Sequence, residues 1–221
     1  MLSGIQRARK LTVCLTENQI RHDRISSKTI ATPWKPTKQQ LLAAEGKTVP
    51  DVIAPALRVL FCGINPGLYT AAVGHHFARP GNRFWPALFA AGFTERLVSP
   101  FDERELLADG YGITNVVMRA TATADQLTRE ELQAGGKRLR AKVRRYKPAF
   151  LAVLGLGAYR AAWNQPKAVI GRQDERIGDT LVWVLPNPSG LNAHYQAKDL
   201  ALVFGELKAA VDHASSLRSR R

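Results

Sequence analysis

The sequence predicts an α/β protein, a three-layer α/β/α sandwich built on a short, mainly parallel central sheet. Two observations lead to this prediction. Short apolar runs of strand length recur along the chain, and segments with helical periodicity lie between them. Regular alternation of this kind is typical of a sheet covered by helices on both faces.

Four apolar runs are expected to form the strands of the sheet. They are short and rich in β-branched residues, as buried strands are, and they cover residues 57–62, 112–117, 149–154 and 181–185. Gly63, Gly155 and Pro186 follow three of the runs and indicate where those strands end.

Five segments are expected to form helices. They cover residues 81–92, 102–109, 129–145, 157–164 and 197–213. The third begins with a capping box from Thr128 to Glu131 and places Leu132, Leu139 and Val143 on one face. Gly135-Gly136 falls inside it and is expected to weaken it.

Composition divides the chain into three parts. Residues 1–50 are polar, carry Pro33 and Pro36, and show no helical period, so a disordered basic arm is expected. Residues 51–213 are expected to form one domain, and residues 214–221 a basic tail. A monomer is expected.

Charge and cysteine content narrow the classes of function. The 221 residues carry a net charge of +14, and residues 1–50 account for only +6 of it, with nine Lys and Arg against three Asp and Glu. The domain is therefore basic too, which favours nucleic acid as the partner. No apolar run is long enough to cross a membrane and no secretory leader is recognised. Cys14 and Cys62 are the two cysteines, which favours a reducing cytoplasm over a disulfide scaffold or zinc ribbon.

Two loops follow predicted strands and have similar chemistry. Gly63-Ile-Asn-Pro-Gly67 follows the first run, and Pro186-Asn-Pro-Ser-Gly190 follows the last. One Asn-Pro pair is typical of a simple turn. Because ligands of open α/β sheets bind beyond the carboxyl ends of the strands, two such pairs predict a shared pocket.

Three segments resemble the motifs of the mismatch-specific uracil-DNA glycosylases, the thymine-DNA glycosylase branch of the uracil-DNA glycosylase superfamily. They are Gly63-Ile-Asn-Pro-Gly-Leu68, Phe77-Ala-Arg-Pro-Gly-Asn-Arg-Phe-Trp85 and Asn187-Pro-Ser-Gly-Leu191, within a resemblance that covers residues 51–213. The resemblance implies hydrolytic excision of uracil, and of related damaged pyrimidines such as cytosine adducts, from mismatched double-stranded DNA. It implies base-excision repair without a cofactor or metal.

The resemblance also implies roles for residues of the pocket. Asn65 would position the attacking water, and Phe77 would stack on the extracted base. Backbone groups of Ile64 and Phe77 would bind the pyrimidine edge, while Thr70 would lie near C5. Asn187 stands where other branches of the superfamily have a histidine that stabilises the leaving anion. With two amides in these places, slow turnover is expected.

A loop that enters the duplex is implied for Gly190, Leu191 and Asn192. An apolar wedge replaces stacking at a kinked step. Ala193 stands where family members often have arginine, and His194 is expected to compensate.

Four further residues have expected positions. Asn115 either faces the pocket or simply closes its strand. Arg83 is expected to anchor the following helix or to lie near a phosphate. His75 and His76 are expected to line the loop over the DNA without binding a metal.

Two other classes of protein share some of these sequence features with a glycosylase. A non-catalytic DNA-binding protein that recognises mismatches or damage would share the charge and the wedge. Asn65, Phe77 and Asn187 together favour an enzyme. A nucleotide-binding oxidoreductase is disfavoured, because Arg160 stands where a dinucleotide fingerprint needs its third glycine.

Overall fold

A computed structural model describes residues 35–218 of the protein, whose centre is a five-stranded sheet. The strands are β1 (Val59–Gly63), β2 (Tyr111–Asn115), β3 (Phe150–Leu154), β4 (Gly171–Ile177) and β5 (Thr180–Leu185). Their order is β2-β1-β3-β5-β4. The pairs β1–β2, β1–β3 and β3–β5 are parallel, and β4 is antiparallel to β5. The predicted mainly parallel α/β sandwich is confirmed.

The edge strand β4 was not predicted. Its residues, Gly-Arg-Gln-Asp-Glu-Arg-Ile, alternate between half-buried and exposed positions and include one large apolar side chain. In contrast, every residue of β1, β2 and β3 is buried, as expected for strands covered on both faces. Pairing with β5, rather than an apolar pattern, makes this polar segment a strand.

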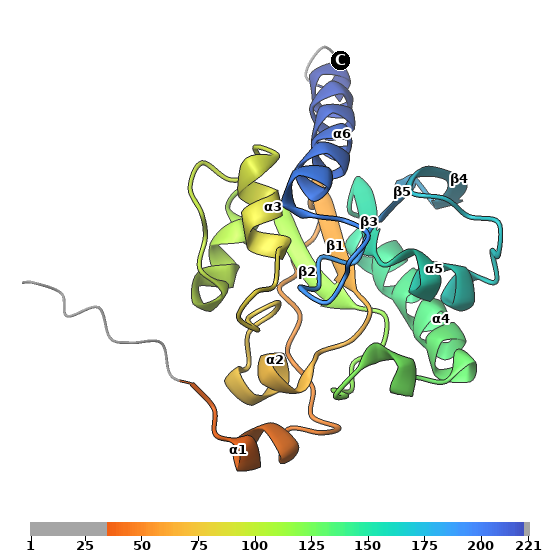
Figure 1. Ribbon diagram of the computed structural model, residues 1–221. Helices are drawn as coiled ribbons and strands as arrows, with labels where there is room; N and C mark the ends of the chain where they lie inside the picture. Colours follow the sequence, from red (N-terminus) through yellow and green to blue (C-terminus); the bar gives the residue numbers. More distant parts are fainter. Residues whose placement is uncertain (1–34, 219–221) are drawn as a thin grey trace, which may run out of the picture. The chain divides into compact units, whose positions relative to one another are not determined.

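Two helical layers cover the sheet (Figure 1). On one face lie α3 (Phe84–Ala90) and α6 (Ala197–Arg218), together with the 3₁₀ helix η1 (Pro100–Leu107); on the other lie α4 (Arg129–Tyr146) and α5 (Leu156–Trp163). The predicted helix at 102–109 is thus a 3₁₀ helix that begins earlier, and α6 continues past the expected tail boundary at 214. No helix of the described residues is long and apolar enough to cross a membrane.

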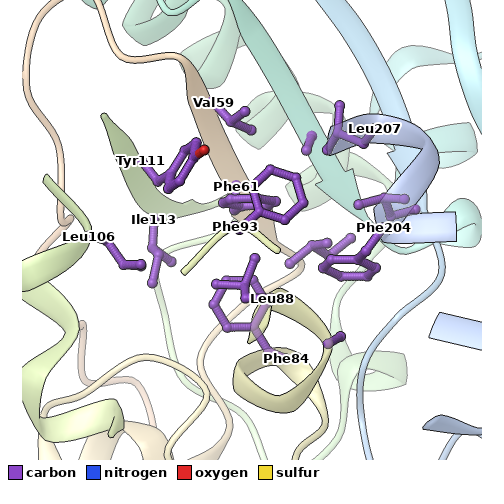
Figure 2. Close-up of a cluster of buried hydrophobic side chains, with 14 of the residues drawn as sticks. Val59, Phe61, Phe84, Leu88, Phe93, Leu106, Tyr111, Ile113, Phe204 and Leu207 are labelled. Carbon is purple, nitrogen blue, oxygen red and sulfur yellow. The ribbon is translucent and has the colours of Figure 1, made fainter. Parts of the chain in front are cut away.

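Aromatic side chains fill the layer between the sheet and α3 and α6 (Figure 2). Phe61 of β1 makes edge-to-face contacts with Phe84 at 5.5 Å and with Phe93 at 5.3 Å between ring centroids. Phe204 of α6 stacks on the same ring at 6.3 Å. Such contacts favour one arrangement of α3 on the sheet, and α3 follows directly on the loop of Phe77.

The glycine pair that was expected to weaken α4 lies within a helix that remains continuous. Gly135 and Gly136 are buried within a continuous helix. A Cβ at Gly135 would lie 2.4 Å from the carbonyl oxygen of Val116, and one at Gly136 would lie 2.6 Å from that of Ala162. The two glycines therefore allow α4 to approach the end of β2 and α5 closely, which their helix propensity alone could not indicate.

Residues 35–50 differ from the prediction of a disordered arm. They include α1 (Lys38–Leu42), which begins with a capping box at Thr37. Ala44 and Val49 are fully buried in a small cluster with Ala71 of α2 (Leu68–Val73). Burial of these apolar side chains holds the segment, and the rest of the predicted arm, residues 1–34, lies outside the described residues.

Candidate active site

A cavity of about 420 Å³ opens at the carboxyl ends of β1, β2, β3 and β5. It brings together nearly all the site residues proposed from the sequence. Those that line it are Ile64, Asn65, Thr70, Phe77, Asn115, Asn187, Leu191 and Asn192. Gly190 instead lines an adjoining cleft of about 250 Å³ between its own loop and residues 79–82.

The Asn65 side chain is held in one orientation by three acceptors. Its amide nitrogen donates to the carbonyl oxygens of Pro66 at 3.2 Å and Arg119 at 3.1 Å, and to Oγ1 of Thr121 at 2.7 Å. If the amide were turned so that Oδ1 took the place of the nitrogen, the oxygen would face these three acceptors. The three acceptors therefore also determine which end of the amide lies there. Oδ1 is left to accept a hydrogen bond from a water molecule or ligand.

Thr121 and Arg119 were not found from the sequence. Thr121 is buried, and its hydroxyl accepts from Asn65 and donates to the carbonyl oxygen of Thr123 at 2.7 Å. Arg119 forms a two-bond ion pair with Glu131 of α4, at 2.6 and 2.9 Å, which holds the pKa of that carboxyl at about 2. Both residues follow the carboxyl end of β2. Their position just after a predicted strand is the one sequence signal that could have indicated them.

Phe77 forms one wall of the cavity and adopts a left-handed backbone conformation, with φ 54°. Its ring stacks on Phe84 of α3, with centroids 4.1 Å apart. A non-glycine residue in this conformation is strained, and such strain is concentrated at functional sites. The packing of α3 thus holds an aromatic face at the cavity.

Asn115 lines the cavity rather than only closing its strand. The residue is 4% exposed, and its amide nitrogen has no hydrogen-bond partner among the described residues. Gly63 makes room for it, since a Cβ there would lie 2.5 Å from Asn115 Oδ1 and 3.3 Å from the Phe77 ring. A buried amide without a partner costs about 1–3 kcal/mol, which a bound ligand could recover.

Asn187 has one end of its amide engaged. Its Oδ1 accepts from the backbone nitrogen of Ser189 at 3.0 Å, which leaves the amide nitrogen able to donate at the cavity. Asn192 closes the same loop by donating to the carbonyl oxygen of Asn187 at 2.9 Å. Leu191 at the loop's tip is 71% exposed, an apolar side chain projecting into solvent beside the cavity.

Arg83 makes its hydrogen bonds within the protein, and its expected place near a phosphate stays a prediction. Its guanidinium donates to the carbonyl oxygens of Tyr195 at 2.6 Å, Ser189 at 2.7 Å and Asn192 at 2.8 Å. The alternative expectation, that this motif anchors the next helix, agrees with the structure, because Asn82 Oδ1 accepts from the first residue of α3. Arg83 thus ties the loop of Leu191 to that helix.

His76 is buried and lines the cavity, and its expected place in the loop over the DNA stays a prediction. Its Nε2 lies 3.0 Å from the carbonyl oxygen of Pro50, and its backbone nitrogen donates to Glu103 at 2.6 Å. His75 lies 3.2 Å from the other oxygen of that carboxylate. This cluster anchors the chain next to Phe77. No group of three His, Cys, Asp or Glu among residues 35–218 could hold a metal ion.

Burial lowers the pKa of His76, with Glu103 opposing the shift in part. The folded protein therefore disfavours the charged imidazole more than the unfolded chain does. The His76 contribution to stability should be complete above the unfolded pKa near 6.5 and should decline as the pH falls below it.

We expect the melting temperature to fall as the pH decreases below about 6.5, and His76→Gln to reduce that slope. Thermal unfolding across this range measures both. His75→Gln is the control, and an equal effect of both substitutions would contradict this explanation.

Comparison with known proteins agrees with the fold. Residues 50–208 match the family model of the Uracil DNA glycosylase superfamily. A solution NMR structure of a protein from Methanosarcina acetivorans, provisionally described as a uracil DNA glycosylase, is similar with a TM-score of 0.50. The two share 18% identity over 74% of this chain and 98% of that chain, a likeness that concerns the fold. Because the family model spans most of its length, the chain belongs to the uracil DNA glycosylase superfamily.

Proposed function

We propose that the protein is a monofunctional glycosylase that removes uracil, and related damaged pyrimidines such as cytosine adducts, from mismatched double-stranded DNA. It would begin base-excision repair, act as a monomer in the cytoplasm, and need no cofactor. The observation that supports this most directly is Asn65, whose amide is held by three acceptors at a cavity walled by an aromatic ring.

The cavity offers the groups that recognition of a flipped base needs. A base inside a duplex must leave the stack before its glycosidic bond can be reached. Phe77 presents a ring face, and the amide nitrogens of Asn115 and Asn187 can donate to carbonyl oxygens of the pyrimidine. Leu191, exposed beside the cavity, fits the role of the wedge that enters the vacated stack.

The groups at the cavity support a hydrolytic reaction in which water is the nucleophile. A water molecule that donates a hydrogen bond to Asn65 Oδ1 attacks C1′ of the sugar. The bond from C1′ to the base breaks, and the base leaves with the bonding electrons. The water then loses a proton to solvent. Asn115 and Asn187 stabilise the departing anion by donating hydrogen bonds. No acidic side chain of the described residues lines the cavity. With Asn65 positioning the water and no carboxylate beside it, slow turnover is expected.

Duplexes carrying one lesion each test this proposal. G·U, G·T, A·U and a cytosine adduct opposite guanine, with single-stranded uracil DNA as the comparison, are incubated with the protein and scored for abasic sites. We expect cleavage of G·U and of the adduct ahead of A·U and of single strands. Tight lesion binding without any abasic product would instead support a non-catalytic protein that recognises damage.

Substrate choice should depend on Thr70, which is 7% exposed and lines the cavity. Thymine differs from uracil by one methyl group at C5, and one methyl against a pocket wall is worth about 1–3 kcal/mol, or roughly 10–200-fold in rate. Thr70→Ala should therefore narrow the ratio of G·U to G·T cleavage, chiefly by raising G·T cleavage.

Single-turnover rates on the two duplexes measure this ratio. Thr94→Ala is the matched control, since Thr94 is equally buried but lies outside the cavity. An unchanged ratio in Thr70→Ala would place this residue away from C5.

A further inference from the structure

A long stretch of the domain without an acidic residue, and with many basic ones, begins inside α4. Residues 132–173 contain no Asp or Glu, while Glu131 and Asp174 bound them on either side. Ten basic residues lie within the stretch: Lys137, Arg138, Arg140, Lys142, Arg144, Arg145, Lys147, Arg160, Lys167 and Arg172. Protein surfaces ordinarily intersperse both signs of charge, so this segment produces a field of one sign.

The structure separates these cations into paired and unpaired groups. Arg140 pairs with Glu175 at 2.8 Å, and Lys142 pairs with Asp51. Lys137, Arg138, Arg144 and Arg145 are exposed, and no ion pair or hydrogen bond joins their side chains to the described residues. We call these four residues the α4 stripe.

Helical geometry places the four side chains on one face. At about 100° per residue they span an arc of about 120° around α4. Ala141, a small exposed residue, lies at the centre of the arc. Leu139 and Val143 lie on the opposite, buried face. The α4 stripe is therefore a continuous basic surface about 12 Å long.

The topology places the stripe away from the cavity. β2 ends at Asn115 in the cavity. β3 begins at Phe150, at the opposite ends of the strands, and ends at Leu154 in the cavity. α4 connects β2 to β3, so it runs from the cavity toward the amino ends of the strands (Figure 1). Arg145 lies about 24 Å along the helix from Arg129, its first residue.

We propose that the α4 stripe binds the phosphates of a second DNA segment while the cavity holds the lesion. The choice of DNA as the partner rests on the function proposed above. Three of the four residues are arginines, which match phosphate geometry with paired donors. The stripe has no exposed large apolar side chain, and an interfacial membrane helix needs such side chains to insert.

Binding of a second duplex by the full chain tests the inference. The cavity is first saturated with a short, unlabelled duplex that carries a tetrahydrofuran abasic analogue opposite guanine. A labelled, lesion-free duplex is then titrated at several salt concentrations and followed by anisotropy. We expect the parent to bind the second duplex with a salt-dependent affinity.

Charge-neutralised variants locate the surface. Lys137→Gln/Arg138→Gln and Arg144→Gln/Arg145→Gln should each weaken second-duplex binding and reduce the slope of log K against log salt by about 2. Arg104→Gln/Lys167→Gln removes the same charge at exposed positions outside the stripe and should leave the slope unchanged. Melting temperatures show whether all three variants fold as the parent does.

Three outcomes would overturn the inference: no second duplex bound by the parent, an equal loss in the control variant, or stripe-dependent binding of phosphatidylserine vesicles in place of DNA. This assay needs no base cleavage. Second-duplex binding by a protein that produces no abasic sites would therefore contradict the proposed function and leave the stripe proposal standing. Abasic sites produced by a protein that binds no second duplex would contradict the stripe proposal and leave the proposed function standing.

Discussion

Asn65→Ala is expected to lower the single-turnover rate of uracil excision by about 10²- to 10³-fold, the usual effect of removing one preorganised polar group from an active site. Binding of lesion DNA should change little, because the amide is occupied by Pro66, Arg119 and Thr121 rather than by a DNA-binding contact. Cleavage under single-turnover conditions and binding to a duplex with a tetrahydrofuran site separate the two quantities.

Thr121 provides the internal control for the orientation of that amide. Thr121→Ala removes one of the three acceptors and should cause a smaller loss of rate, whereas Thr121→Ser keeps the hydroxyl and should restore most of it. An Asn65→Ala variant that cleaves at the parent rate would show that the water is positioned by another group. Equal rates for Thr121→Ala and Thr121→Ser would show that the hydroxyl does not orient Asn65.

Gly136→Ala is expected to destabilise the protein, although replacing glycine by alanine within a helix ordinarily stabilises it. The added Cβ would lie 2.6 Å from the carbonyl oxygen of Ala162, so α4 or α5 must shift. Overpacking of this kind costs about 1–3 kcal/mol, and each kcal/mol lowers the melting temperature of a domain this size by about 2–4 °C. Gly135→Ala, facing Val116, should behave in the same way.

Gly205 of α6 is the matched control for this prediction. A Cβ there would contact nothing within 4 Å, so Gly205→Ala should leave the melting temperature unchanged or raise it slightly. Thermal unfolding of the three variants measures the difference. A rise in Gly136→Ala equal to that in Gly205→Ala would show that the close approach of α4 to α5 can relax without cost.

The cavity could be anticipated because its elements are local in sequence. The apolar runs that became β1, β2, β3 and β5 are each buried on both faces, so their composition alone distinguishes them. The loops that carry Asn65 and Asn187 follow two of these strands directly. Once the sheet is parallel, chain topology brings both loops to one edge.

Tertiary structure alone decided which polar groups meet. Arg83 contacts carbonyl oxygens more than 100 residues away, and Asn65 contacts Thr121 across 56 residues. No local periodicity reports such partners. An exposed arginine and a half-buried one that donates to three carbonyl oxygens have the same sequence signal.

The segments that the sequence misrepresented have a related cause. β4 is a strand because β5 offers it a ladder of backbone hydrogen bonds, and residues 35–50 are ordered because Ala44 and Val49 fit against α2. The glycines of α4 are compatible with a helix because carbonyl oxygens of other segments occupy the space of their missing side chains. Periodicity and strand-end motifs determined the sheet and the position of the cavity; contacts between distant segments decided edges, anchors and close approaches, because those depend on the shape of the neighbour.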